Sequence, residues 1–128
     1  MPFLPQNDRE WLESTGWDFQ EVEGDGKRGV IVRDFPLLHG KFQTDHVSVL
    51  VMIPQGYPDA APDMFWCDPA LMLVTAQKQP NATNVSETHF GTTWQRWSRH
   101  YVAGQWRSGI DDLHAHFTMV RNSLRDAA

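Results

Sequence analysis

The stretch Gly56-Tyr57-Pro58-Asp59-Ala60-Ala61-Pro62-Asp63-Met64-Phe65-Trp66 decides how this chain folds. It follows residues 47–53, an apolar run with the alternation of a β-strand. Each proline fixes its own φ and pushes the preceding residue toward extended geometry, so Tyr57-Pro58 and Ala61-Pro62 fit neither a helix nor a central strand. The stretch therefore predicts a rigid surface corner, after which the chain returns as a short strand at residues 64–66.

A short helix is expected before the first strand. Asn7 and Glu10 stand three residues apart, which is the spacing of a capping box, and Gly16 is a typical helix stop. Because these signals lie close together, the predicted helix has only about two turns.

Strands are predicted on both sides of the corner. Gly24-Asp25-Gly26 is a strong hairpin signal. Pro36 has no N–H to donate to a ladder, so it should end the strand that returns from this hairpin. The expected strands cover residues 17–22, 29–35, 45–53 and 64–66, and they would form a four-stranded antiparallel meander.

Residues 68–101 lack a clear period, and the sequence predicts a long irregular segment there. Such segments are unusual in compact domains and often carry function. Within it, Trp94, Trp97 and Tyr101 stand three and four residues apart. This spacing favours a short helical turn packed on the core over a ligand-stacking platform.

A second helix is predicted toward the end of the chain. Ser108 and Asp111 suit its start, because small polar and acidic side chains favour a helix N-terminus. Apolar residues follow at the three- and four-residue spacings of one helix face, namely Ile110, Leu113, Phe117, Val120 and Leu124. The order of elements indicates a single α+β domain over residues 1–128.

The composition narrows the class of protein. With 128 residues, 41% of them hydrophobic, the chain is long enough to bury a core, and its net charge of −5 argues against nucleic acid or anionic membranes as partners. One cysteine excludes an intrachain disulfide and a cysteine-rich zinc site. The sequence begins without a signal-peptide pattern and holds no membrane-spanning run, so we expect a cytoplasmic protein.

His114-Ala115-His116 is the one pattern that suggests a metal site. Residues two apart on a helix point about 200° away from each other, so both imidazoles cannot bind one ion from one face. We therefore expect neither a metal nor another cofactor.

The corner resembles a motif of the ubiquitin-conjugating enzymes, tyrosine-proline-x-x-x-proline, here Tyr57, Pro58 and Pro62. Residues 105–113 are similar to that family's tryptophan-serine-proline approach to the helix after the active site. Trp106 is present there, whereas the serine-proline pair is shifted or lost. Over most of its length the chain resembles the divergent bacterial members, the prokaryotic family E. The resemblance implies a ubiquitin-conjugating-like fold.

The same resemblance directs attention to Ser98. The family's nucleophilic cysteine stands about eight residues before the tryptophan, and counting back from Trp106 gives Ser98. A histidine-proline-asparagine motif precedes that cysteine by about ten residues. Here His89 stands nine residues before Ser98, followed by phenylalanine and glycine. The histidine is thus approximately kept, the asparagine is absent, and serine replaces cysteine.

A serine hydroxyl needs a base to become a nucleophile at neutral pH. His100, two residues after Ser98, and His89 are the candidates. The alternative is that Ser98 is an ordinary polar loop residue. Cys67 is a rival nucleophile, but no basic residue flanks it and Asp68 would raise its pKa. We therefore interpret Cys67 mainly as a core residue.

Two functions follow from the resemblance. The first is a conjugating enzyme that accepts a ubiquitin-like protein from an adenylating, activating-type enzyme, as an oxyester on Ser98. The second is a catalytically inactive module of the same fold that binds a ubiquitin-like protein or acts as a scaffold. Positive charge from Arg96, Arg99 and Arg107 would suit an acidic partner surface near Ser98.

Overall fold

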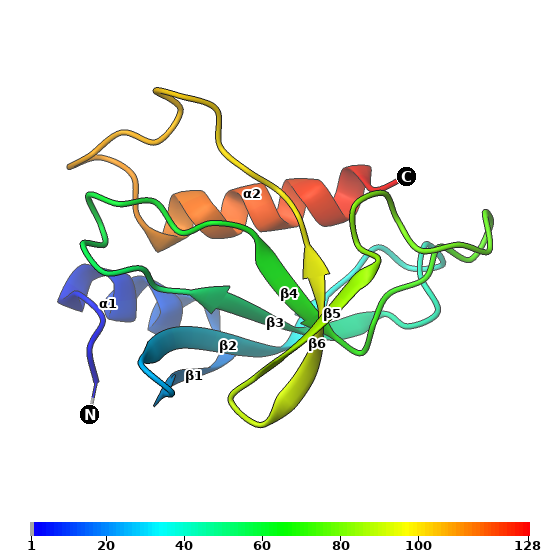
Figure 1. Cartoon of the computed structure of the whole chain (residues 1–128), viewed down its shortest axis with the longest axis horizontal. Helices are drawn as coiled ribbons and strands as arrows, with labels where there is room; N and C mark the ends of the chain where they lie inside the picture. The colour runs from blue at the N-terminus through cyan, green and yellow to red at the C-terminus, as the bar shows by residue number, and fades with distance from the viewer. Residues whose placement is uncertain (1) are drawn as a thin grey trace.

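The computed structural model describes residues 2–128 and contains one antiparallel sheet with two helices on one face (Figure 1). The six strands are ordered β1-β2-β3-β4-β6-β5. Along the chain the elements are α1 (Gln6–Thr15), β1 (Asp18–Gly24), β2 (Lys27–Pro36), β3 (His46–Met52), β4 (Phe65–Asp68), β5 (Val85–His89), β6 (Thr92–Trp97) and α2 (Leu113–Asp126). The predicted α+β class is confirmed. No helix within residues 2–128 has the length and apolar character needed to cross a membrane.

The first four strands form the predicted meander. The hairpin between β1 and β2 turns at Asp25 and Gly26, whose φ values of 52° and 74° suit a tight two-residue turn. Pro36 is the last residue of β2, as its missing N–H requires. Helix α1 ends at Gly16 in the left-handed region, as predicted, but Asn7 lies inside the helix, and Pro5 occupies the N-cap without a side-chain cap. The expected capping box was therefore wrong.

Two strands occupy part of the segment that was expected to be irregular. β5 and β6 pair as a hairpin, and β6 also pairs with β4, so the sheet has six strands instead of four. The sequence of β5 is polar and mostly exposed, which leaves little periodic signal. Trp94 and Trp97 belong to β6, not to a helical turn, and they enter two different hydrophobic clusters on opposite faces of the sheet.

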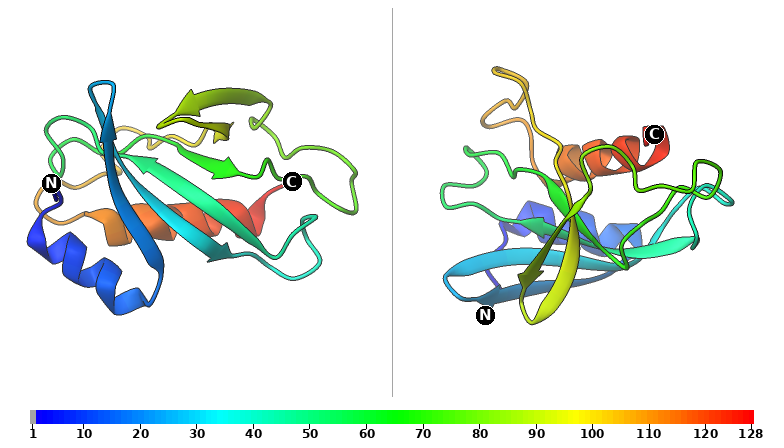
Figure 2. Two further views of the ribbon diagram at one scale, coloured as in Figure 1. Left: turned by 90° about the horizontal axis from the view of Figure 1, so that it is seen from below. Right: turned by 45° about the vertical axis from the view of Figure 1, so that its right-hand side comes forward.

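β5 and β6 form one edge of the twisted sheet (Figure 2), and the turn of their hairpin comes close to β2. A small cluster forms beneath the hairpin, containing Ile31, Leu50, Trp66 and Trp94. Phe90, at the turn of the hairpin, comes so close to β2 that a Cβ at Gly29 would lie 3.2 Å from its ring. Glycine at this position therefore allows the turn of the hairpin to come close to β2.

Helix α2 covers the inner face of the sheet and is capped by Asp112. The Asp112 carboxylate accepts hydrogen bonds from the backbone N–H groups of His114 (3.1 Å) and Ala115 (3.4 Å). The predicted start at Ser108 was thus too early, and Ile110 is 65% exposed in the preceding segment instead of lying on the buried helix face. The other members of the predicted face are buried: Leu113, Phe117, Val120 and Leu124.

A buried carboxylate connects α1, the proline corner and α2. Asp8 is 1% exposed. One of its oxygens accepts a hydrogen bond from the Tyr57 hydroxyl at 2.7 Å, and the other accepts one from the Leu113 N–H at 3.2 Å. Leu113 is the first residue of α2, so Asp8 satisfies an N–H that the helix itself cannot pair. Burial is the main cause of the raised pKa of Asp8, ahead of the opposing hydrogen bond from Tyr57.

Removing the Asp8 carboxylate should destabilise the whole domain. Asp8→Ala leaves the Leu113 N–H and the Tyr57 hydroxyl without their partner, and we expect the free energy of unfolding to fall by about 2–4 kcal/mol. Urea denaturation followed by tryptophan fluorescence would measure it. Glu10→Ala is a matched control, because Glu10 is an exposed carboxylate on the same helix. Equal stability of the two variants would contradict the role assigned to Asp8.

The raised pKa of Asp8 also predicts a pH dependence. The folded chain holds the Asp8 proton more tightly than the unfolded chain, so ionisation favours unfolding and stability falls as pH rises above the ordinary value of 3.8. Asp8→Asn removes this contribution. The free energy of unfolding of the wild type minus that of Asp8→Asn should therefore decrease from pH 3.5 toward neutrality, roughly until the folded-state pKa is passed. A difference that increases with pH would show that the sign is wrong.

Candidate functional site

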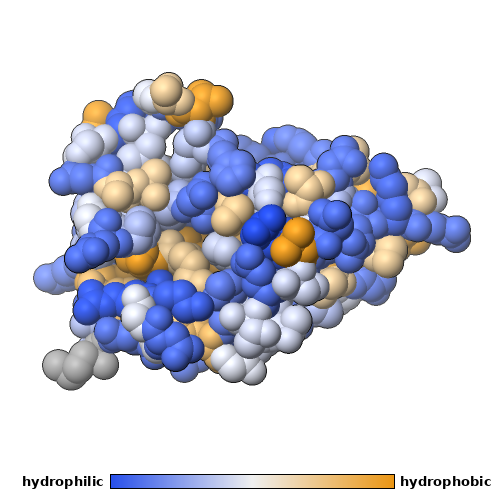
Figure 3. Space-filling view, viewed as in Figure 1, coloured by the Kyte–Doolittle hydropathy of each residue, from blue (hydrophilic) through white to orange (hydrophobic). Residues whose placement is uncertain are grey.

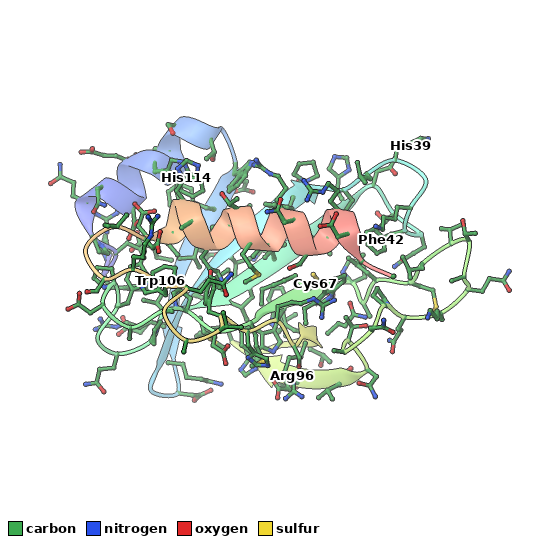
Figure 4. The ribbon with its side chains drawn as sticks, turned by 90° about the horizontal axis from the view of Figure 1, so that it is seen from above. His39, Phe42, Cys67, Arg96, Trp106 and His114 are labelled. Atoms are coloured by element: carbon green, nitrogen blue, oxygen red, sulfur yellow. The ribbon has the colours of Figure 1, made fainter. Side chains whose placement is uncertain are left out.

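The segment of residues 98–112 joins β6 to α2 and arches above the sheet (Figure 1). It is attached to the proline corner. The Trp106 indole N–H donates to the Pro58 carbonyl at 2.9 Å, and the Ser108 hydroxyl donates to the Asp59 carboxylate. The tryptophan and the tyrosine-proline corner, far apart in sequence, thus form one contact, and Figure 4 shows Trp106 near the beginning of α2.

A buried imidazole holds the same segment to α2. His116 is 0% exposed, and its Nε2–H donates to the Met64 carbonyl at 3.0 Å while its Nδ1 accepts from the Tyr101 hydroxyl at 2.7 Å. Burial lowers the pKa of His116 to about 4, so the ring is neutral at physiological pH. Both ring nitrogens are used in structural bonds, and the imidazole joins β4, α2 and the segment.

Three side chains at the end of β6 and just after it lie on the side of α2. Trp97 is in the core beneath α2, the Arg99 guanidinium carbon lies 4.9 Å from the Trp97 ring centre, and Tyr101 bonds to α2. Residues 97, 99 and 101 therefore face α2. Ser98 and His100 flank Arg99 in the sequence, and the His100 ring contacts Asp63 of the proline corner.

The backbone at Ser98 is fixed while its side chain is partly exposed. Its N–H donates to the Ala82 carbonyl at 3.0 Å. Its carbonyl accepts from the Arg99 guanidinium at 3.1 Å, and the same guanidinium nitrogen donates to the Asn81 carbonyl at 3.2 Å. Within residues 2–128 the Ser98 hydroxyl takes part in no hydrogen bond of the structure.

His100 is held by an aspartate that the sequence analysis did not single out. Its Nδ1 lies 2.7 Å from Asp63 Oδ1, and the two side chains are 59% and 60% exposed. The Nε2 atom makes no hydrogen bond within the described part of the chain. Asp63 belongs to the proline corner, 37 residues away in sequence, and no local pattern connects it to His100.

His89 lies at the other end of the β5–β6 hairpin from Ser98. It pairs with Thr92 at the closed end, whereas Ser98 follows the open end. Six residues of extended chain, about 20 Å, separate Thr92 from Ser98. The His89 ring accepts from the Lys27 ammonium at 2.8 Å and donates to Glu87 at 3.1 Å. The structure therefore does not bring His89 to Ser98, and its bonds tie the hairpin to the turn between β1 and β2.

Cys67 is fully enclosed. It lies in the middle of β4, in the main core beneath α2, with 0% of its surface exposed (Figure 4). Burial raises the pKa of the thiol well above its ordinary value, so the reactive thiolate is disfavoured. The position agrees with the interpretation of Cys67 as a core residue.

Of the three arginines expected around Ser98, two are paired with carboxylates. Arg96 binds Glu87 at 3.1 Å and Arg107 binds Asp111 at 3.2 Å. Arg99 forms no ion pair among residues 2–128 and binds backbone carbonyls instead. Burial lowers the pKa of Arg99. The positive charge nearest Ser98 therefore comes from Arg99.

A groove of about 630 Å³ lies between the segment and the outer side of α2. Arg99, Tyr101 and Trp106 line it from the segment, and Met119 and Asn122 line it from α2. Ser98 does not line this groove, although its neighbour Arg99 does.

The two histidines of the His114-Ala115-His116 pattern face different surroundings. His114 stacks on Trp11 of α1, with ring centres 4.7 Å apart, whereas His116 is buried against Tyr101. Their different partners follow from the helical period.

The comparisons with known proteins gave one match. A family model described as prokaryotic E2 family E matches residues 4–127. Neither the comparison with curated proteins nor that with solved structures returned a match. The match covers α1, all six strands, the segment and α2.

The enclosure of Cys67 can be measured by alkylation. In the folded chain we expect iodoacetamide to modify Cys67 at least about 10³-fold more slowly than in the chain unfolded in guanidinium chloride at the same pH, because access requires opening of the core. Intact-mass spectrometry would give both rates. Similar rates in the two states would return Cys67 to consideration as a nucleophile.

Proposed function

We propose, because the chain belongs to the prokaryotic E2 family E, that it accepts a ubiquitin-like protein from an activating enzyme and carries it as an ester on Ser98. Membership in this family gives the chain a conjugating-enzyme-like character. The partners, the oxyester and a cytoplasmic location are parts of the proposal. An amine or hydroxyl on a target would then receive the ubiquitin-like protein.

One observation carries the proposal. Ser98 and His100 stand two residues apart directly after β6, and the serine hydroxyl and the imidazole Nε2 both lack a hydrogen-bond partner in residues 2–128. Cys67, the one cysteine of the sequence, is closed to any partner by complete burial. A hydroxyl with a neighbouring base is the arrangement that nucleophilic oxygen catalysis requires.

The transfer step uses a thioester or acyl adenylate held by the activating enzyme. His100 Nε2 accepts the hydroxyl proton as Ser98 Oγ attacks the activated carbonyl carbon. The new bond is the ester C–O bond, and the bond that breaks joins the carbonyl carbon to the thiol sulfur or to the AMP oxygen. The imidazolium then returns the proton to the leaving group, so no oxidant or further reactant is needed.

A non-catalytic binding module is the second candidate. The observation that favours it is the exposure of apolar side chains on the segment, where Val102 is 71% and Ile110 is 65% exposed. Figure 3 shows apolar atoms at the top of the molecule, where the segment protrudes. Exposed apolar residues beside a groove suit a protein-binding surface, and such a module would need neither Ser98 nor His100.

The ester is testable by its chemistry. With an activating enzyme, a ubiquitin-like protein and ATP, the chain should form a covalent adduct that survives thiol reducing agents and is cleaved by hydroxylamine or base. Ser98→Ala should abolish it, and Ser98→Cys should load through a bond that thiols cleave. His100→Ala should slow formation by roughly 10²–10⁴-fold. Gel mobility and intact mass would detect the adduct.

Cys67→Ala is the control for this experiment. It should still load, with a loss of stability of about 1–3 kcal/mol from the cavity left in the core. An adduct that thiols cleave and that Cys67→Ala lacks would assign the site to the cysteine. An active enzyme mixture that never loads the wild type would favour the binding module.

A further inference from the structure

We infer that Asp63 is a positioning residue that holds the ring and the tautomer of His100 for its role as the base of Ser98, and this inference rests on the proposed function. Asp63 Oδ1 lies 2.7 Å from His100 Nδ1, a distance at which the carboxylate accepts the Nδ1–H. Holding the proton on Nδ1 leaves the lone pair on Nε2. The base thus has the tautomer that can take a proton from the Ser98 hydroxyl.

The backbone places Asp63 and His100 opposite each other. β4 and β6 are antiparallel, with Phe65 opposite Trp97, so the residues before β4 run beside those after β6. The Met64 N–H donates to the Arg99 carbonyl at 3.1 Å and extends this contact beyond the ladder. This bond lies one residue out of register with the Phe65–Trp97 pair, and Asp63 and His100 are the next residues along the two segments.

The residue next to Asp63 is anchored at both of its backbone polar groups. The Met64 N–H is bonded to the Arg99 carbonyl, and the Met64 carbonyl accepts from the buried His116 ring at 3.0 Å. Met64 has a φ of 62°, in the region that non-glycine residues seldom adopt. These bonds fix the direction in which the chain enters β4, and they thereby fix the position of the Asp63 carboxylate. Pro62, buried on the other side of Asp63, restricts the chain further.

The solvent exposure of the Asp63–His100 pair determines how much it contributes to stability. An ion pair or charge-assisted bond that is about 60% exposed contributes little to stability in water. A partner protein that covers Ser98 would exclude water from the same place and strengthen the bond. Asp63 should therefore matter for the reaction of Ser98 far more than for folding, which separates positioning from a structural role.

A small activated ester tests this without any partner protein. The full chain is incubated with p-nitrophenyl acetate, and acetylation of Ser98 is followed by peptide-mapping mass spectrometry. Asp63→Asn should slow it roughly 10- to 100-fold, less than the ~10⁴-fold lost when the aspartate of a buried serine–histidine–aspartate site is replaced. Asp63→Glu, which keeps a carboxylate, should recover part of the rate. Nitrogen-15 NMR should show less of the Nδ1–H tautomer of His100 in Asp63→Asn, with the unfolding free energy nearly unchanged.

Asp45→Asn is the matched control. Asp45 binds His39 Nδ1 at 3.0 Å in another exposed pair, and Figure 4 shows His39 at the opposite end of the molecule from Trp106. In this variant Ser98 should be acetylated at the wild-type rate.

The outcomes separate this inference from the proposed function. A wild-type rate of acetylation in Asp63→Asn, or no acetylation of Ser98 in the wild type, would overturn the inference. If Asp63→Asn forms the adduct with the ubiquitin-like protein as fast as the wild type does, the positioning role of Asp63 is wrong and the proposed function stands. If acetylation depends on Asp63 but no such adduct forms, positioning stands and the proposed function fails.

Discussion

The buried carboxylate of Asp8 is the interaction on which the arrangement of this domain depends. It satisfies the first N–H of α2 and the hydroxyl of Tyr57, so one side chain fixes the relative positions of α1, the proline corner and α2. Burying a carboxylate is unfavourable, as its raised pKa shows. The two donors offset that cost because neither would otherwise have a partner in the same apolar surroundings. Asp112 caps the next N–H groups of α2, so two acidic residues stand at the positive end of the helix dipole.

The proline corner connects Asp8 to the candidate site. Its tyrosine is held by Asp8, its carbonyl at Pro58 receives the Trp106 indole, and its last residues lead through Asp63 into β4. The segment of residues 98–112 is held by hydrogen bonds to the corner and to the buried His116, and by the packing of Trp106 on Tyr57 and Tyr101. A largely irregular segment can therefore present Ser98 and His100 from a fixed backbone. Such support by rigid neighbouring elements is what a reactive group needs to keep its geometry.

The burial of Cys67 limits which nucleophile the chain can use in the proposed reaction. Sulfur would be the better nucleophile at neutral pH, but the one cysteine lies in the core, where its thiolate is disfavoured. An oxygen nucleophile requires a base and an orientation for that base. In the proposed reaction His100 is the base and Asp63 orients it, whereas His89 is bonded to Lys27 and Glu87 at the other end of the hairpin. The two candidate bases thus have different environments, set by their bonds.

The sequence by itself determined the features that depend on local geometry. Prolines restrict φ wherever they stand, so the corner at Tyr57-Pro58 and the end of β2 at Pro36 could be predicted, as could the Asp25-Gly26 turn and the apolar face of α2. The motifs around Tyr57 and Trp106 were enough to predict the family.

The tertiary structure alone decided what depends on partners distant in sequence. β5 is a strand because β6 pairs with it, although its own residues are polar, and Trp94 and Trp97 separate because β6 has a face on each side of the sheet. The helix start moved from Ser108 to Asp112 because Asp8, more than a hundred residues earlier, binds the Leu113 N–H. Asp63 meets His100 only because β4 and β6 lie side by side. Hydrogen bonds between distant residues carry no local signal, so no periodicity or spacing could have revealed them.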